Sequence, residues 1–104
     1  MFSTFLSPAP DVMKRDSVRI ISEILRLVLR EPATITRIAY GTNLNHQAAE
    51  NYLATLSRRG LIGVTVSVGG RSIYSITKRG SDVLLDLENV LYKLSTERNP
   101  SSDT

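Results

Sequence analysis

Five cationic side chains occupy a stretch of the sequence that contains no acidic residue. The stretch runs from 51 to 81 and includes a segment, 61–76, in which apolar and polar residues alternate around two glycines, as is typical of a β-hairpin. A basic hairpin directly after a helix, with no acid nearby, suits a surface that meets a polyanion. Its cations are Arg58, Arg59, Arg71, Lys78 and Arg79.

Catalytic and metal chemistry, by contrast, has few candidate residues. The chain has no Cys, which excludes disulfides, thiolate metal sites and a Cys nucleophile. No carboxylate pair flanks the single histidine, His46, and no nucleophile is paired with a base. The sequence therefore predicts no enzyme activity, no metal site and no cofactor.

The charge is unevenly distributed along the 104 residues. Residues 1–80 hold 11 Lys and Arg against five Asp and Glu, whereas residues 81–104 hold two against five. This asymmetry predicts that the first part meets an anion and that the C-terminal part has another role. With 41% apolar and 22% charged residues, a soluble globular domain is expected. Neither a membrane span nor a secretory signal is recognisable, so we expect a cytoplasmic protein.

The elements that position the cations begin after a loose N-terminal arm, residues 1–15, whose apolar residues either contact a partner surface or belong to a disordered leader. A first helix is predicted over 17–30, with Asp16 as its N-cap and Pro32 ending it. Its apolar stripe includes Val18, Ile21, Leu25 and Val28. Ile20 and Leu27 lie off the stripe, which indicates burial against a second chain as well as against the core.

A helix-turn-helix is predicted next. Its first helix spans about 34–40, with Thr34 as N-cap and Gly41 as a left-handed terminator, and its second spans 46–59, capped by Asn45 and closed by Gly60. The second helix has an inner side of Leu44, Ala48, Tyr52, Leu53 and Leu56. Its predicted outward residues are Asn45, His46, Gln47, Glu50, Asn51, Thr55 and Arg58.

The loop length decides the hairpin register. A two-residue loop, Gly69-Gly70, pairs Val66 with Ile73 and divides the apolar residues between the two faces. A three-residue loop that adds Arg71 pairs Val66 with Tyr74 and places one apolar face inward, which the alternation of side chains demands. The pattern favours the three-residue loop, with Arg71 at its exposed tip.

A last helix is predicted over 78–97, capped by Thr77 and followed by a disordered tail, 98–104. Its apolar stripe is too wide for a small domain, 16–77, to cover. An antiparallel helix pair in a homodimer would bury the remainder. The predicted dimerisation residues are Ile20, Leu27, Val83, Leu84, Leu87, Val90, Leu91 and Leu94.

Three local runs carry a family resemblance. They are the 44–53 run on the second motif helix, the Ser57-Arg58-Arg59-Gly60-Leu61-Ile62 exit, and Tyr74-Ser75-Ile76-Thr77-Lys78-Arg79-Gly80, similar to a Tyr-x-(Leu/Ile)-Thr-x-x-Gly signature that closes a wing. Over about 16–97 the chain resembles small archaeal winged helix-turn-helix DNA-binding proteins that dimerise through a C-terminal antiparallel coiled coil. The resemblance implies an α+β, mainly α, winged helix-turn-helix fold with a long C-terminal dimerisation helix.

Each candidate DNA contact has a structural alternative. The polar face of the second motif helix is placed to meet base edges, because Asn and Gln side chains pair with adenine. In the alternative, Asn45 only caps the helix and the other residues face solvent. The residues concerned are Asn45, His46, Gln47, Asn51 and Thr55. Glu50 can accept from cytosine N4 or repel phosphate. Arg58, Arg59, Lys78 and Arg79 suit phosphates, although a helix C-terminus favours the first two anyway. Thr34, Thr36 and Arg37 are candidate backbone anchors, and Gly69 and Gly70 let Arg71 approach a minor groove or phosphate.

The leading hypothesis is thus a homodimer that binds double-stranded DNA, as a transcriptional regulator or a chromatin-type architectural protein. The alternative is a winged-helix protein-interaction module, or a subunit of a larger assembly, that docks through its first and last helices.

Overall fold

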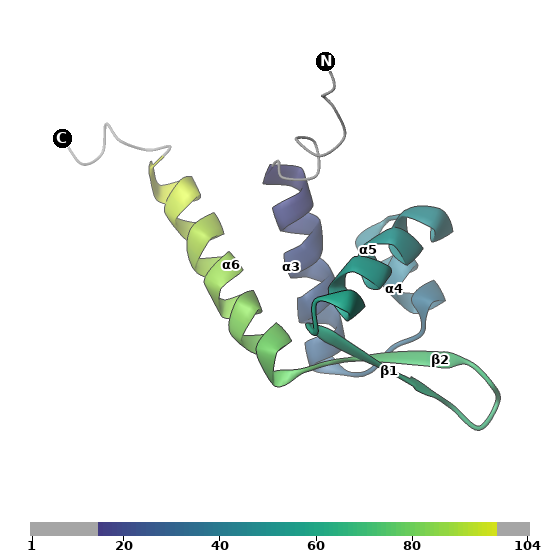
Figure 1. The fold of residues 1–104 in the computed structure, drawn as a ribbon. Helices are drawn as coiled ribbons and strands as arrows, with labels where there is room; N and C mark the ends of the chain where they lie inside the picture. The colour runs from purple at the N-terminus through teal and green to yellow at the C-terminus, as the bar shows by residue number, and fades with distance from the viewer. Residues whose placement is uncertain (1–14, 98–104) are drawn as a thin grey trace, which may run out of the picture.

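The computed structural model describes residues 15–97, and in this range it confirms the predicted fold class. The elements follow the order α3 (Arg15–Arg30), α4 (Ile35–Thr42), α5 (His46–Arg58), β1 (Ile62–Val66), β2 (Ser72–Ile76) and α6 (Lys78–Glu97). α4 and α5 form the helix-turn-helix, the hairpin extends away from the helices, and α6 runs beside α3 before diverging from it (Figure 1). Residues 1–14 of the predicted arm, 1–15, and the predicted tail, 98–104, lie outside the described residues, whereas Arg15, the last residue of the arm, begins α3.

α3 differs from the predicted first helix at its N-terminal end. It includes Asp16, which was expected to be the cap. An acidic residue is favoured both at the cap and in the first turn of a helix, so residue type alone does not separate the two positions. The apolar stripe was predicted correctly, because Leu25 and Val28 are buried, together with Ile24.

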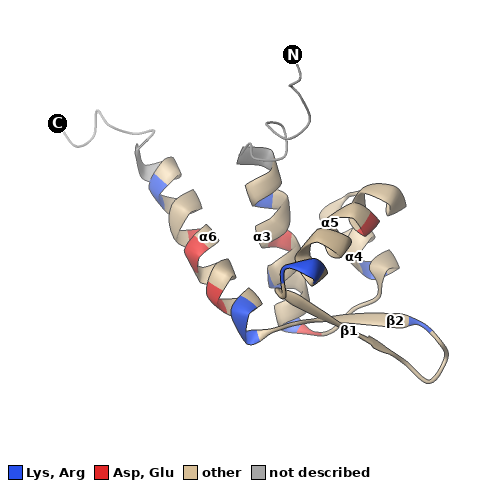
Figure 2. Cartoon of the chain, viewed as in Figure 1, with Lys and Arg blue, Asp and Glu red and all other residues tan. Residues whose placement is uncertain are grey.

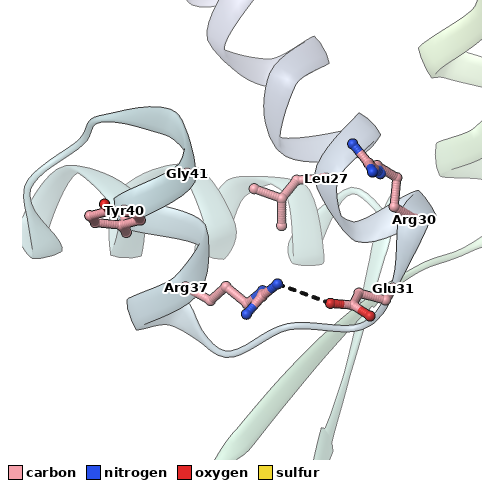
Figure 3. Close-up of a pocket in the computed structure, with 6 residues that line it drawn as sticks. All are labelled: Leu27, Arg30, Glu31, Arg37, Tyr40 and Gly41. Atoms are coloured by element: carbon pink, nitrogen blue, oxygen red, sulfur yellow. Dashed lines mark ion pairs between the residues drawn. The ribbon is translucent and has the colours of Figure 1, made fainter.

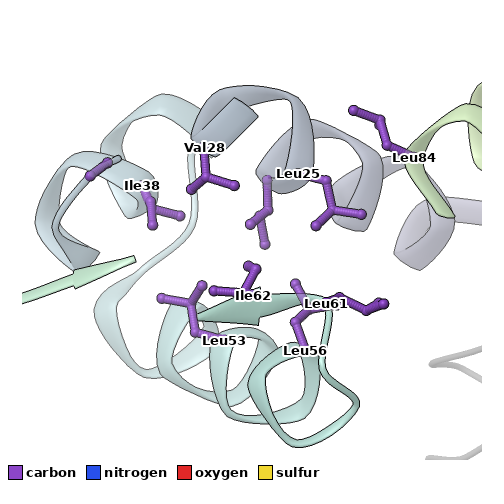
Figure 4. Packing of buried hydrophobic residues seen from close by; sticks show 10 residues of the cluster. Leu25, Val28, Ile38, Leu53, Leu56, Leu61, Ile62 and Leu84 are labelled. Carbon is purple, nitrogen blue, oxygen red and sulfur yellow. The ribbon is translucent and has the colours of Figure 1, made fainter. Parts of the chain in front are cut away.

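The core lies where α3, the helix-turn-helix and the base of the hairpin meet. Ile24, Leu25 and Ile38 are fully buried there, and Leu84 brings the first turns of α6 against the same cluster (Figure 4). Burial of one such side chain stabilises the fold by about 1.5–3 kcal/mol. The other buried members of the cluster are Val28, Ala33, Leu53, Leu56, Leu61 and Ile62.

The turn between α4 and α5 is built differently from the prediction. Gly41 lies inside α4, and the left-handed residue is Asn43, with φ 60° and ψ 40°. Asn adopts this conformation more readily than most residues. Gly41 instead lies against α3, where a Cβ would be 2.5 Å from Cδ1 of Leu27, the end of a flexible side chain that can rotate away.

Side-chain caps define the N-termini of both motif helices, as predicted. The Thr34 hydroxyl accepts from the backbone N–H of Arg37 at 3.3 Å, and Asn45 accepts from Ala48 N–H at 2.7 Å. Gly60 follows the C-terminus of α5 with a positive φ of 77°. The inner side of α5 was only partly predicted, because Ala49 is fully buried although it was not assigned there.

The hairpin adopts neither of the two expected registers. Val64 pairs with Tyr74 and Ile62 with Ile76, which is two residues away from the favoured alignment. A shift of two keeps the same side chains on each face, so the predicted faces are correct although the pairs are not. The difference arises at Ser67, whose N–H donates to the Arg71 carbonyl at 2.8 Å. The three-residue loop is therefore 68–70, and Arg71 lies just before β2 instead of forming the tip.

Two further contacts fix the hairpin to the helices. Ala33, just before α4, exchanges two backbone hydrogen bonds with Tyr74 at 2.9 and 2.8 Å, which adds a bridge beside β2. At the other end of β2, the Thr77 hydroxyl accepts from Gly80 N–H at 2.9 Å and donates to the Gly60 carbonyl at 2.7 Å. Thr77 thus caps α6, as predicted, and also ties α6 to the end of α5.

Candidate nucleic-acid interface

The N-terminal half of α5 presents a polar, exposed face. Asn45, His46, Gln47 and Asn51 are all exposed, as the sequence indicated. The Gln47 side-chain amide donates to Asn51 Oδ1 at 3.3 Å, so the two amides lie one helical turn apart on the same strip. Nε2 of His46 lies 3.4 Å from a Glu50 carboxylate oxygen.

Thr55 departs from this face. It is half-buried and lines a small, mostly apolar pocket with Ile21, Tyr52 and Leu56, and Asn51 lines the same pocket. Thr55 is therefore less exposed than the polar residues with which it was grouped, although it lies beside Asn51.

Arg71 lies across an open groove from the start of α4. The groove is lined by Thr34, Thr36 and Arg37 from the first motif helix and its cap, by Glu50 of α5, and by Arg71 and the return strand. The groove thus brings together the predicted backbone anchors at the start of α4, the acidic residue of the α5 face and the arginine of the hairpin. Both Thr36 and Arg71 are exposed.

Arg37 already has an acidic partner at this groove. Its guanidinium lies 3.1 Å from a Glu31 carboxylate oxygen, in a pocket that also includes Leu27, Tyr40 and Gly41 (Figure 3). Both members of the pair are mostly exposed, and such surface pairs contribute only about 0–1 kcal/mol. An incoming phosphate can therefore compete for Arg37 at small cost.

Apart from Arg71, the cations of the acid-free stretch 51–81 lie at a basic corner where the end of α5 meets the start of α6 (Figure 2). Nε of Arg79 donates to the Arg59 carbonyl at 3.1 Å, and Lys78 lies 4.0 Å from Asp82. The Arg79 bond satisfies a carbonyl at the C-terminus of α5, which gives this residue a structural role that the sequence did not reveal. The corner consists of Arg58, Arg59, Lys78 and Arg79.

The acid-free cations consequently do not form one patch. Arg58 follows His46 by twelve residues of helix, or about 18 Å at 1.5 Å per residue. Arg71 lies at the opposite end of β2 from Lys78. The groove and the polar end of α5 form one candidate surface, and the basic corner forms another.

The predicted dimerisation residues differ in how far the chain itself covers them. Leu84 is buried in the core, and Val83, Leu87, Ile20 and Leu27 are partly buried against it. Leu91 is half-buried, whereas Val90 and Leu94 are exposed. Two large exposed side chains on α6, Leu85 and Tyr92, were missed because they lie off the predicted stripe.

Residues 15–97 offer little for other kinds of site. Within this range no helix is both long and apolar enough to cross a membrane. The same residues contain no group of three or more His, Asp and Glu side chains placed to hold a metal ion.

Comparison with known protein families assigns the fold to one of them. A family model described as winged helix-turn-helix matches residues 14–95. The chain belongs to this family. No curated protein matches the sequence significantly. The winged helix-turn-helix match includes both candidate surfaces and most of α6.

Solved structures with the same fold are similar along much of the chain. Sso10a-2, a DNA-binding protein from Sulfolobus solfataricus, is 27% identical with a TM-score of 0.70, over 86% of this chain and 95% of its own. The transcriptional regulator BldR from the same organism is 24% identical with a TM-score of 0.72, over 77% of this chain. The match spans only 59% of BldR. The PcaV transcriptional regulator from Streptomyces coelicolor is 20% identical with a TM-score of 0.67, over 72% of this chain and 55% of its own.

Proposed function

We propose that this winged helix-turn-helix protein binds double-stranded DNA as a homodimer and acts as a transcriptional regulator or a chromatin-type architectural protein. α5 enters the major groove and the hairpin, or wing, lies on the backbone or in the minor groove. The observation that carries the proposal is the exposed pair Gln47 and Asn51, beside a groove that contains Arg71. Sso10a-2 and BldR, a DNA-binding protein and a transcriptional regulator, support the same function.

The side chains of this surface suit the two kinds of DNA contact. Gln and Asn amides can each donate and accept, which matches the N6 and N7 edge of adenine in the major groove. Arg71 and Arg37, together with the first N–H groups of α4, suit phosphate oxygens on either side of the inserted helix. In this arrangement the basic corner contacts phosphates farther along the duplex.

The homodimer is proposed to form through α6. Val90 and Leu94 are 46% and 38% exposed in the single chain, on a helix that diverges from the core (Figure 1). Burying them against the same helix of a second chain removes apolar surface from water, at a gain of about 25 cal/mol per Å². An antiparallel pair of α6 helices satisfies this requirement with two-fold symmetry.

Fluorescence anisotropy with labelled duplex DNA over a range of salt concentrations tests the proposal. Gln47→Ala combined with Asn51→Ala should weaken binding to a preferred sequence by about 30-fold or more, since two good base contacts contribute about 1–3 kcal/mol of discrimination each. Asn89→Ala, at an exposed position on α6, is the matched control and should leave binding unchanged. No salt-dependent binding by the wild-type protein at micromolar concentration would overturn the proposal.

A protein-interaction module is the second candidate. Leu85 and Tyr92, 61% and 72% exposed on α6, favour it because they give this helix a further apolar surface. In that case, substitution of Leu85 by Glu abolishes assembly with a partner while the Gln47 and Asn51 variants have no effect.

A further inference from the structure

The wing carries a row of exposed valines that do not belong to the hydrophobic core. Val64 and Val66 are 44% and 70% exposed on one face of β1, and Val68 in the loop is completely exposed at 108%. β-Branched residues favour strands, which accounts for Val66. It does not account for Val68, because loops of this kind usually carry Gly, Asn, Asp or Ser.

The valine face lies on the same side as the proposed DNA-binding helix. Val64 and its cross-strand partner Tyr74 line a shallow groove together with Glu50, Asn51, Ala54 and Ser57 of α5. Because side chains two residues apart share a face, Val66 continues that side outward along the strand. The face thus runs from the polar strip of α5 toward the end of the wing, which extends well clear of the helices (Figure 1).

The outer part of the wing, around Val66 and Val68 and beyond the groove that Glu50 lines, favours an anionic partner. The acid-free stretch 51–81 includes the whole wing, and Arg71 pairs with Ser67 directly beside the loop. A Cβ added at Gly69 would meet its nearest atom at 4.0 Å, and one added at Gly70 would meet none within 4 Å, so nothing bulky surrounds the apex. An apolar tip with a flanking arginine and two glycines suits the minor groove, where apolar wedges unstack bases and bend the duplex.

We propose that Val66 and Val68 form such a wedge and that the protein bends the DNA that it binds. The inference rests on the proposed function and adds to it a mode of contact and a consequence for the DNA. Arg71 anchors the wing at the backbone while the two valines enter the minor groove. Part of the recognition then depends on how easily a base step deforms, which favours flexible pyrimidine–purine steps.

Energy transfer between dyes on the two ends of a duplex of about 20–30 bp measures the bending. Wild-type protein should increase the transfer at saturation. The double variant Val66→Thr, Val68→Thr keeps the shape and strand preference of both residues but makes them polar. It should bind about tenfold more weakly and restore the transfer toward that of free DNA. Circular dichroism checks that the variant is folded.

The salt dependence of DNA affinity distinguishes the apolar contribution of the two valines from the electrostatic contribution of Arg71. The valine variant should keep the wild-type slope of log affinity against log salt, whereas Arg71→Ala should reduce the slope by about one. Thr65→Ser, on the other face of β1, is the matched control and should change neither bending nor affinity.

Three outcomes would overturn the wedge. Unchanged bending and affinity in the valine variant would reject it and leave the proposed function intact. Loss of self-association with normal DNA binding would assign the valines to a protein contact instead. Failure of wild-type protein to bind any duplex would reject the proposed function, and the wedge with it.

Discussion

Replacing Gly80 by alanine tests how the wing is held to the helices. A Cβ at this position would lie 2.0 Å from the carbonyl oxygen of Leu61 and 2.9 Å from Cγ1 of Ile76. Ordinary contact begins at 3.4 Å, so the start of α6 and the residue before β1 must separate by about 1.4 Å. The obstacle is backbone, which cannot move aside as a flexible side chain can.

The cost can be estimated from the contacts that this movement strains. Overpacking costs about 1–3 kcal/mol. The Leu61 carbonyl also accepts from Thr77 N–H at 3.2 Å, and loss of that bond adds about 1 kcal/mol. The better helix propensity of alanine offsets this loss of stability by up to about 1 kcal/mol. A net loss of about 1–3 kcal/mol is expected, which lowers the Tm by about 5–20 °C in a domain of this size.

Thermal unfolding followed by circular dichroism measures this loss. Gly69→Ala is the matched control, because its nearest neighbouring atom is 4.0 Å away and its backbone has no positive φ. The control should change the Tm by only a few degrees. Equal Tm values for the two variants would refute the view that α6 and the wing base are held in backbone contact at Gly80.

Three further predictions concern caps and the proposed dimer. Thr77→Ala removes a hydroxyl with two hydrogen bonds and should cost about 1–2 kcal/mol in denaturant unfolding, whereas Thr77→Ser should retain most of the stability. Asn45→Ala removes the cap of α5 and should cost about 1 kcal/mol, and wild-type stability would show that the cap is dispensable. Val90→Glu with Leu94→Glu should halve the mass measured by light scattering without unfolding the chain, and a wild-type monomer at micromolar concentration would remove the argument for dimerisation through α6.

Most of the fold could be predicted because its signals are local. Thr34, Asn45 and Thr77 are capping residues followed by helical periodicity, and all three cap as expected. Alternation likewise identified the hairpin and its faces. The register could not be predicted, because it depends on the bond between Ser67 and Arg71, and a shift of two residues leaves the alternation pattern unchanged.

The two glycines that were misread or not explained act through tertiary contacts. Gly41 has the residue type of a helix terminator, but it lies inside α4, where its nearest neighbour is the Leu27 side chain of another helix. Gly80 belongs to a recognisable signature, yet the reason for a glycine there is a carbonyl nineteen residues earlier in the chain. Sequence spacing contains no information about either approach.

The sequence indicated which residues of the candidate surface are exposed, but not how they are arranged relative to one another. The exposed amides of α5 follow from helical spacing after a cap, and the structure presents them together. The sequence assigned the five cations to a helix exit, a loop tip and a helix start, but it did not predict that four of them gather at one corner. The lengths of α5 and β2 separate Arg71 from the basic corner, and Arg79 is partly engaged in closing the end of α5.

The measurement that tests the central claim most directly is a backbone amide NMR titration of the protein with duplex DNA. The proposed surface predicts that the largest shift changes fall on residues 45–51 at the start of α5 and its cap, on residues 34–37 and on the wing around 66–71. The amides of α6 beyond residue 83 should change little. Shift changes confined to α6, or none at saturating DNA, would contradict the claim that the polar end of α5 and the wing form the DNA-binding surface.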